Sequence, residues 1–280
     1  MLARRNVLHH VLKSDSTHAG LWLDKFLIAQ TVAKDEDRPA DAAAQAAAKK
    51  AVGAKAKLIQ EVSELPIPEG YRQALARRQD LFKELDKRGG AKVSIAATEG
   101  RLIIGLGQKG PVEAGIALEH TWGVPILPGS ALKGLTAAAA HQLLADPSWH
   151  KDGKGRDPQG QGGRGDSLGE VAGTIEHIGG VVFHDAWWVP SESDAKLPIH
   201  LDVMTVHHQD YCSTQGEQPP TDMDNPNPVA FASVTGNFLV AVEKSRPDVP
   251  AIYLEAAMCI LRMGLERLGI GAKTNAGYGR

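Results

Sequence analysis

The most informative stretch of the chain reads LGIGAKTNAGYGR, from Leu268 to Arg280. Its four glycines, at positions 269, 271, 277 and 279, permit positive φ angles and place no Cβ between the backbone and a ligand. Lys273, Thr274 and Asn275 lie between them and add a positive charge and short polar groups. Such a loop suits a phosphate backbone, but a tight turn before a final strand explains the same residues equally well. Both interpretations stay open at this level.

A second stretch, VPILPGSALKG from Val124 to Gly134, predicts the start of a helix. Ser130 is a natural N-cap residue, which places Lys133 at the third helical position. A cation there is unfavourable by a few tenths of a kcal/mol to about 1 kcal/mol, unless an anion lies over the helix N-terminus. The lysine therefore indicates an anionic ligand, and an exposed lysine that points into solvent is the alternative.

Composition and charge limit the class of protein. The chain has 280 residues, enough for one large domain or two small ones. Its net charge of -2 excludes a protein that coats nucleic acid by bulk electrostatics, so RNA binding requires a local site or an assembly. Cys212 and Cys259 are the only cysteines, which fits a reducing compartment. Without a long apolar span or a recognisable secretory signal, we expect a cytoplasmic protein with no membrane partner.

Periodicity predicts a helical region followed by mixed strands and helices. Residues 1–90 read as helical, with an alanine-rich helix over 41–57 and a charged helix over 69–87. The apolar positions of the charged helix are Tyr71, Leu75, Leu81 and Leu85. Strands are expected at 92–97, 101–106, 114–119, 181–186, 199–206 and 237–243. Helices are expected at 130–144 and 250–268, the latter with a face of Ile252, Ala256, Ile260, Met263 and Leu268. The pattern is α+β or α/β.

Two glycine motifs fail the tests of their context. Residues 105–110 match the dinucleotide fingerprint G-x-G-x-x-G. A strand-like segment follows where a helix should begin, and no acidic ribose partner stands about 20 residues further on. A P-loop needs lysine where Leu135 stands. An oxidoreductase is therefore only a remote alternative, and we expect no cofactor.

Histidine and aspartate residues cluster between Asp202 and Asp210, with His207 and His208 among them, and His184 lies upstream. A metal-dependent phosphoesterase could use such ligands, and a single histidine could act as the general base in RNA cleavage. No spacing fixes these residues on one face of an element. We expect no metal site and no catalytic residue, and an endoribonuclease is the alternative.

Eight segments, in their order along the chain, resemble the RAMP superfamily of CRISPR proteins, and most closely the sixth Cmr subunit of type III-B effector complexes. They are Ala19–Leu23, Leu102–Gly107, Glu113–Leu118, Gly123–Gly134, Gly180–Ala186, Asp202–Tyr211, Asp224–Pro228 and Gly269–Gly279. Each segment alone is nonspecific, and their common order carries the signal.

This resemblance implies an α+β fold with a ferredoxin-like core, as in RNA recognition motifs. We expect a helical region at residues 1–90 packed on a core at 91–280, with insertions at about 151–168 and 187–228. The aromatic residues that stack bases in RNA recognition motifs are not evident on a predicted strand. The last strand must be short or include the glycine-rich tail itself.

The resemblance further implies a noncatalytic subunit that holds guide RNA toward its 3′ end and supports target RNA recognition. Its expected protein partners are the repeated backbone RAMP subunit, which cuts the target, and a capping RAMP subunit. The expected RNA-binding residues are Lys109, Gly129, Ser130, Lys133, Gly269, Gly271, Lys273, Thr274, Asn275 and Gly277.

Overall fold

The computed structural model describes residues 8, 11–27, 42–108, 114–151, 165–206, 211, 217, 219–221 and 227–280. The chain divides into two compact units, each assembled from segments far apart in sequence. The first unit comprises Met1–Pro68, Gly105–Ile116 and Ala195–Ser233, and the second comprises Glu69–Ile104, Ala117–Asp194 and Val234–Arg280. The domain boundary expected at residue 90 stays a prediction.

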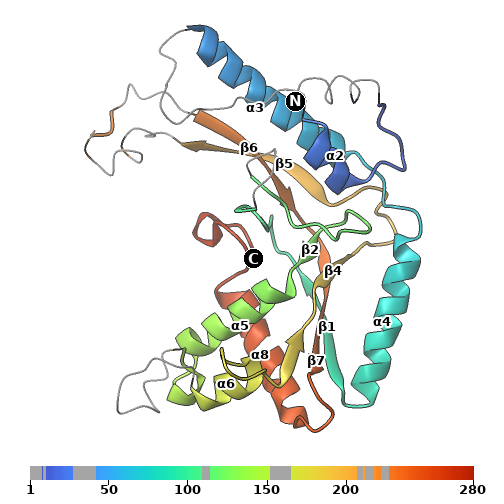
Figure 1. Ribbon diagram of the computed structural model, residues 1–280, viewed down its shortest axis with the longest axis vertical. Helices are drawn as coiled ribbons and strands as arrows, with labels where there is room; N and C mark the ends of the chain where they lie inside the picture. Colours follow the sequence, from blue (N-terminus) through green and yellow to red (C-terminus); the bar gives the residue numbers. More distant parts are fainter. Residues whose placement is uncertain are drawn as a thin grey trace. The chain divides into compact units, whose positions relative to one another are not determined.

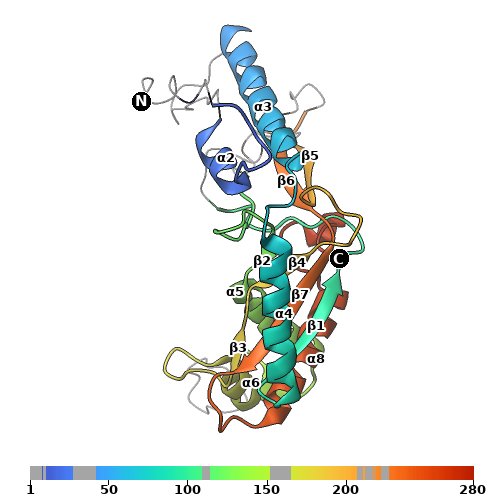
Figure 2. The same cartoon turned by 90° about the vertical axis from the view of Figure 1, so that its right-hand side faces the viewer.

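The second unit is built around one antiparallel sheet with strand order β1-β7-β4-β2, in which β3 also pairs with β7. Its strands are β1 (Ala91–Ala97), β2 (Ile126–Leu127), β3 (Val181–Phe183), β4 (Ala186–Val189) and β7 (Asn237–Lys244). Its longer helices are α4 (Tyr71–Lys87), α5 (Gly129–Leu143) and α8 (Ala251–Arg267), with the shorter α6 at Asp166–Ala172. Helices α5 and α8 cover one face of the sheet and α4 covers the other, as Figures 1 and 2 show.

The chain order β1, α5, β3 with β4, β7, α8 is the β-α-β-β-α order of a ferredoxin-like fold, so the predicted α+β class is confirmed. Strand β7 lies in the middle of this sheet, and Phe238 to Val242 are all buried because helices cover both faces. The strand predicted at 181–186 is divided into β3 and β4 by His184 and Asp185.

Helix α8 forms where it was predicted, but its buried face matches the expected one only in part. Ile260 of the expected face is buried, as are Leu254, Ala257, Leu261 and Gly264, whereas Ile252 is 65% exposed. A Cβ on Gly264 would lie 3.1 Å from the Cβ of Ala139, so glycine allows α5 to approach α8 closely. The sequence of α8 offers two apolar faces that are nearly equally extensive, and packing against α5 determines which of them is buried.

The strand predictions at 101–106 and 114–119 were wrong. These segments form only isolated bridges, from Leu102 to Val234 and from Leu118 to Pro125. Glycines at 105 and 115 interrupt them, and a Cβ at Gly115 would lie 2.7 Å from the carbonyl oxygen of Gly105. The two segments lie side by side through backbone hydrogen bonds from Ala117 N–H to the Ile104 carbonyl and from Gly115 N–H to the Leu106 carbonyl, without forming a strand.

The described part of the first unit includes the helices α2 (Ala19–Lys25) and α3 (Ala42–Ser63) and a two-stranded sheet of β5 (Ile199–Val206) and β6 (Asn227–Val234). Trp22 Nε1 donates a hydrogen bond to Glu61 Oε2 at 2.9 Å, which joins α2 to α3. Among the residues that the structure describes, no helix has the length and apolar character to cross a bilayer.

Candidate nucleic-acid interface

The glycine-rich tail after α8 folds back on the second unit. Gly269, Gly271, Gly277 and Gly279 have φ angles of 74°, 91°, 91° and 79°. A Cβ on Gly271 would lie 2.2 Å from the carbonyl oxygen of Ile103, and one on Gly279 would lie 2.1 Å from that of Ile270. Only at Gly277 would a Cβ meet open space. Glycines 269, 271 and 279 are thus required for packing within the chain itself.

The tip of the tail stays exposed. A 3-10 turn, η2 (Thr274–Ala276), forms it, and Lys273, Asn275 and Gly277 are exposed while Thr274 is half-buried. Lys273 has a φ of 58° and is the only non-glycine residue with positive φ in the described part of the chain. A left-handed conformation costs a residue with a Cβ about 1–2 kcal/mol. The lysine therefore occupies a position at which glycine would be more stable.

The start of α5 differs from the sequence expectation, because Ser130 is not its N-cap. Pro128 occupies that position, and the Gly129 N–H donates to Asp185 Oδ1 at 2.7 Å. Gly129 is buried, and a Cβ there would lie 2.1 Å from the carbonyl oxygen of Phe183. Close packing of β3 on the helix start brings Asp185 to it. The Asp185 carboxylate supplies, at the start of α5, the negative charge that the sequence led us to expect from a bound anion.

Ser130 and Lys133 nevertheless remain accessible. Ser130 is exposed and Lys133 is half-buried. Lys133 is the fifth residue of α5 rather than the third, so the unfavourable effect of the helix dipole is weaker than expected. No described residue forms an ion pair with it.

A half-buried cation, Arg78, fixes the loop that carries Asp185. Arg78 of α4 donates from Nη2 to the carbonyl oxygen of Asp185 at 3.2 Å. Its guanidinium carbon lies 4.6 Å from the ring centroid of Trp187 and 5.1 Å from that of Phe82. Burial lowers the pKa of Arg78 below its usual range. Sequence reasoning missed this arginine, because 107 residues separate it from its partner.

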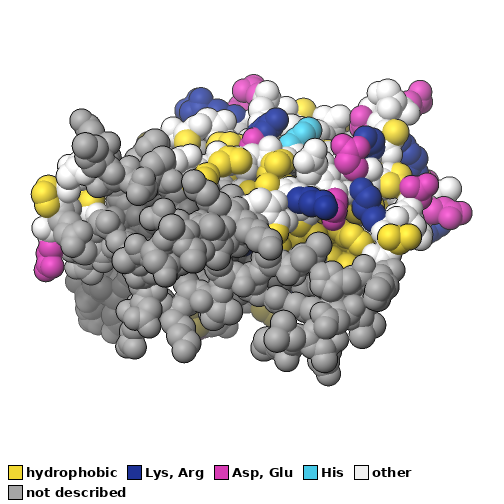
Figure 3. All heavy atoms as spheres, turned by 90° about the horizontal axis from the view of Figure 1, so that it is seen from above, with side chains coloured by type: hydrophobic (Ala, Val, Ile, Leu, Met, Phe, Trp, Pro, Cys, Tyr) yellow, Lys and Arg dark blue, Asp and Glu magenta, His cyan; other side chains and the backbone are white. Residues whose placement is uncertain are grey.

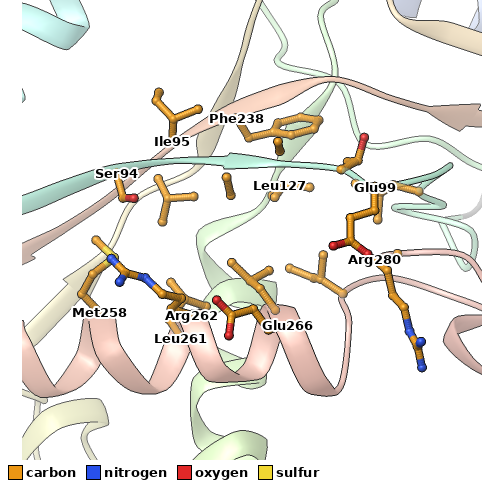
Figure 4. A pocket seen from close by; sticks show the side chains of 18 residues that line it. Ser94, Ile95, Glu99, Leu127, Phe238, Met258, Leu261, Arg262, Glu266 and Arg280 are labelled. Atoms are coloured by element: carbon orange, nitrogen blue, oxygen red, sulfur yellow. The ribbon is translucent and has the colours of Figure 1, made fainter.

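One cavity of about 310 Å³ lies between β1 and α8 (Figure 4). Leu127, which precedes α5, lines it together with Ile270 and Gly279 of the tail. Arg262 and Glu266 rise from α8 toward the strand above them. Leu127 of β2 and both ends of the tail border the cavity, whereas the residues of α5 and the tip of the tail do not line it. Lys109 lies outside the described residues.

The charged surface carries both signs. On the described part of the face in Figure 3, Lys and Arg side chains are interspersed with Asp and Glu. The cavity shows the same balance, with Arg262 and Arg280 against Glu99 and Glu266. Binding of a polyanion must therefore rest on individual residues and not on a field of one sign.

The residues of the alternative nuclease are engaged with other side chains. His184 Nε2 lies 2.8 Å from Glu243 Oε2, and its ring meets Phe82 edge-on. Asp202 Oδ2 accepts a hydrogen bond from Ser233 Oγ at 2.6 Å. His207, His208 and Asp210 lie outside the described residues. Within the described ranges, no three His, Cys, Asp or Glu residues are grouped to hold a metal ion.

Two stacked aromatic residues, Tyr71 and Trp188, lie in the core of the second unit. Tyr71 stacks on Trp187 and Trp188 at centroid distances of 6.0 and 6.3 Å. Tyr71 is 0% exposed and Trp188 is 1% exposed. Tyr71 donates a hydrogen bond to the carbonyl oxygen of Trp188. The buried Tyr71 and Trp188 rings hold α4 on the sheet and offer no stacking surface for bases.

Comparison with known proteins places these features in a family. Residues 96–280 match the model of the RAMP superfamily. The chain is 30% identical over 226 residues to the CRISPR system Cmr subunit Cmr6 of Pyrococcus furiosus. That match covers 65% of each chain, so this chain spans slightly less than two thirds of its curated relative's length.

Two solved structures are also similar. The cryo-EM structure of the type III-B Cmr-beta bound to cognate target RNA matches with a TM-score of 0.57 and 20% identity. That match covers 89% of this chain and 76% of the other, and it indicates a shared fold. The crystal structure of Cmr6 from Pyrococcus furiosus gives a TM-score of 0.42 at 30% identity, over 68% of this chain and 96% of the other.

Proposed function

The chain belongs to the RAMP superfamily, and from this membership we propose that it is a noncatalytic, RNA-binding subunit of a type III-B CRISPR ribonucleoprotein. In this role it holds guide RNA toward the 3′ end and supports target RNA recognition in antiviral defence. The 30% identity to a relative named as a Cmr subunit supports the assembly. Its protein partners would be the repeated backbone RAMP subunit and a capping RAMP subunit.

The observation that carries this proposal is the strained lysine at the tip of the tail. Lys273 is exposed and left-handed, and no described residue forms an ion pair with it. Residues held in a costly backbone conformation concentrate at functional sites. An ammonium group on a loop fixed by neighbouring glycines suits a phosphate oxygen. The strain is then the cost of presenting that charge.

The start of α5 supplies a second contact. Leu127, two residues before α5, lines the same cavity as Ile270 and Gly279 of the tail, and α5 itself carries an exposed hydroxyl at Ser130 and the half-buried Lys133. A half-buried lysine lays its methylene groups on the helix and keeps its charge in solvent. Both elements offer groups that bind the sugar–phosphate backbone of RNA and do not read its bases. A subunit that holds guides of any sequence needs contacts of this kind.

The charge of the protein favours RNA binding within an assembly over RNA binding by the isolated chain. With a net charge of -2 and charges of both signs on its surface, the protein provides few phosphate contacts of its own. Neighbouring subunits of the assembly would supply the others.

The test is guide occupancy in the assembled complex. The double variant Lys133→Ala with Lys273→Ala should lower the RNA recovered with the complex. It should also reduce the slope of log K for RNA binding against log salt concentration by about 1.4, since each phosphate contact to a single strand contributes roughly 0.7 to that slope. The matched control is Lys83→Ala with Lys87→Ala on α4, whose side chains are 63% and 75% exposed. Equal RNA occupancy in both double variants would count against the proposal.

An endoribonuclease is the second candidate, and the His184–Glu243 pair is the observation that favours it. A histidine held by a carboxylate can act as a general base. Incubation of the pure protein with guide precursor and with guide–target duplex, with Mg²⁺ and with EDTA, separates the two functions. We expect no cleavage. Site-specific cuts that His184→Ala or Asp202→Ala abolishes would reverse the assignment.

A further inference from the structure

The loop from Gly173 to Gly180, between α6 and β3, presents two isoleucines to solvent. Ile175 is fully exposed and is the most exposed large apolar side chain in the described part of the chain, and Ile178 is 83% exposed. All residues from 174 to 178 are exposed, whereas the glycines on both sides are buried. Figure 2 shows the loop extending outward beside β3. Single exposed apolar residues are common, but two on one projecting loop indicate a contact surface.

Closely packed glycines fix the base of this loop. Gly173 has a φ of 77°, and a Cβ there would lie 2.5 Å from the backbone nitrogen of Gly179. The Gly180 N–H donates to the Glu170 carbonyl at 2.7 Å, and the Ser245 N–H donates to the Gly180 carbonyl at 2.9 Å. The two ends of the loop are therefore held together and anchored to α6 and to the end of β7.

The side chain of Thr174 fixes the tip. Its Oγ1 accepts hydrogen bonds from the backbone N–H groups of Glu176 and His177, at 3.2 and 3.0 Å. The Thr174 N–H in turn donates to the His177 carbonyl at 2.9 Å. Ile175 and Ile178 are thus held in position before any contact forms. Ordering a flexible loop on binding costs affinity, and a loop that is already ordered avoids that cost.

The charges around the two isoleucines are negative. Glu170 and Glu176 are exposed, and the sequence from 165 to 180 contains no lysine or arginine. Arg246, in the connection from β7 to α8, is paired with Asp248 at 3.5 Å. Negative charge repels the phosphates of RNA, and membrane-binding surfaces depend on lysine, arginine and interfacial aromatic residues. A protein pocket with an apolar floor and a positively charged border complements this loop.

We propose that this loop docks the chain onto a neighbouring protein subunit, with Ile175 and Ile178 inserted in an apolar pocket that lysine or arginine residues border. The proposal rests on the function proposed above, because the neighbouring subunit belongs to the same ribonucleoprotein. It adds the surface of this chain that makes the contact and the chemistry of the surface that receives it.

The docking loop is separate from the glycine-rich tail. Gly180 bonds to Ser245, which follows the end of β7. The Glu99 N–H donates to the Arg280 carbonyl, and the adjacent Thr98 N–H donates to the carbonyl of Gly236, which precedes the start of β7. Eight residues of β7 lie between these points, which correspond to about 25 Å of extended chain. A substitution in the loop therefore leaves the tail and its RNA contacts in place.

A second copy of this chain is a poorer occupant than a different subunit. Two copies that met through the same loop would bring Glu170 and Glu176 against their equivalents, and like charges repel. A contact between the loop and another surface of the same chain would be head-to-tail and would repeat from copy to copy. A subunit with a defined place in an assembly needs one neighbour of different structure.

Binding to an assembly that lacks this chain tests the proposal. The probe is the recombinant type III-B complex assembled from the other subunits with guide RNA, titrated with the full chain and followed by biolayer interferometry. Ile175→Gln with Ile178→Gln should weaken binding about 100-fold, because each buried isoleucine contributes about tenfold or more. The matched control is Leu81→Gln with Ile95→Gln, at side chains that are 58% and 50% exposed. It should change the affinity little.

Two further variants test the order of the loop and its charge. Thr174→Val removes the oxygen that fixes the tip and should weaken binding about fivefold, because the loop must then be ordered on contact. Glu170→Gln with Glu176→Gln should make the affinity less sensitive to salt, because the attraction to a positively charged border is lost. Unchanged salt sensitivity would contradict that border.

The outcomes separate this proposal from the function on which it rests. Equal binding by the isoleucine double variant and the wild-type chain, or equal losses in that variant and the control, would overturn the docking loop alone. Guide RNA occupancy that does not depend on the chain would overturn its RNA-binding role and leave the loop standing. A wild-type chain that does not bind the assembly would overturn both. Isoleucine-dependent self-association, or isoleucine-dependent binding to phosphatidylcholine–phosphatidylserine vesicles, would identify another occupant and overturn the proposal.

Discussion

Replacing Lys273 with glycine should stabilise the protein while it weakens RNA binding. The left-handed backbone at this position, with φ of 58°, costs a lysine about 1–2 kcal/mol. Glycine adopts the conformation freely but loses more entropy on folding, by roughly 0.5–1 kcal/mol. The side chain is exposed, so its removal costs little packing. Lys273→Gly should therefore raise the free energy of unfolding by about 0.5–1 kcal/mol.

The matched variant Lys273→Ala separates strain from charge. Alanine keeps the Cβ and thus the strain, so the free energy of unfolding should stay within about 0.5 kcal/mol of the wild-type value. Both variants lose the ammonium group and should lose RNA affinity equally. Urea denaturation of the two variants measures the first effect, and RNA recovery in the assembled complex measures the second. Equal stabilities for Lys273→Gly and Lys273→Ala, or full RNA occupancy in either, would refute the reasoning.

Three other substitutions test the local structure. Gly271→Ala should lower the free energy of unfolding by about 2–4 kcal/mol, because its Cβ would lie 2.2 Å from a carbonyl oxygen. Gly277→Ala should lower it by only about 1 kcal/mol, through backbone strain alone, and urea denaturation compares the two variants. Asp185→Ala should cost about 1 kcal/mol by removing the carboxylate from the start of α5, and similar stabilities for this variant and wild type would contradict that capping role. Arg78→Met should keep the packing stem but lose the cation over Trp187, which should lower stability by about 1 kcal/mol or more; an unchanged urea midpoint would contradict this contribution.

Elements with strong local patterns could be predicted from the sequence. Helices α4, α5 and α8 and strands β1, β5 and β7 lie close to their expected ranges because periodicity and flanking glycine or proline define them. Strand β6 was not predicted, although Pro228 to Ala232 form a short apolar run. Such a run is ambiguous without its partner strand.

Contacts between residues far apart in the sequence determine features that local sequence patterns could not predict. The carboxylate at the start of α5 comes from Asp185, 56 residues further along the chain, while Ser130 is the nearer candidate by every local rule. The apolar face of α4 includes Phe82 rather than Leu81, which is 58% exposed. Neither choice is visible until the sheet brings its covering elements together.

The conformation of the glycine-rich tail could be predicted only in part. Its glycines were expected to have positive φ, and the structure confirms that conformation at 269, 271, 277 and 279. Gly271 and Gly279 also pack closely against Ile103 and Ile270, which only the folded chain reveals. The strain at Lys273 also appears only in the backbone angles, because no local sequence rule places lysine in the left-handed region.

Photo-crosslinking from position 273 in the assembled ribonucleoprotein tests the central claim most directly. A photoreactive amino acid placed at Lys273 should yield crosslinks to the guide RNA, and the same group at Lys83 on α4 should not. Crosslinks from position 273 to protein alone, or equal RNA crosslinking from both positions, would contradict the assignment of the tail to the RNA backbone.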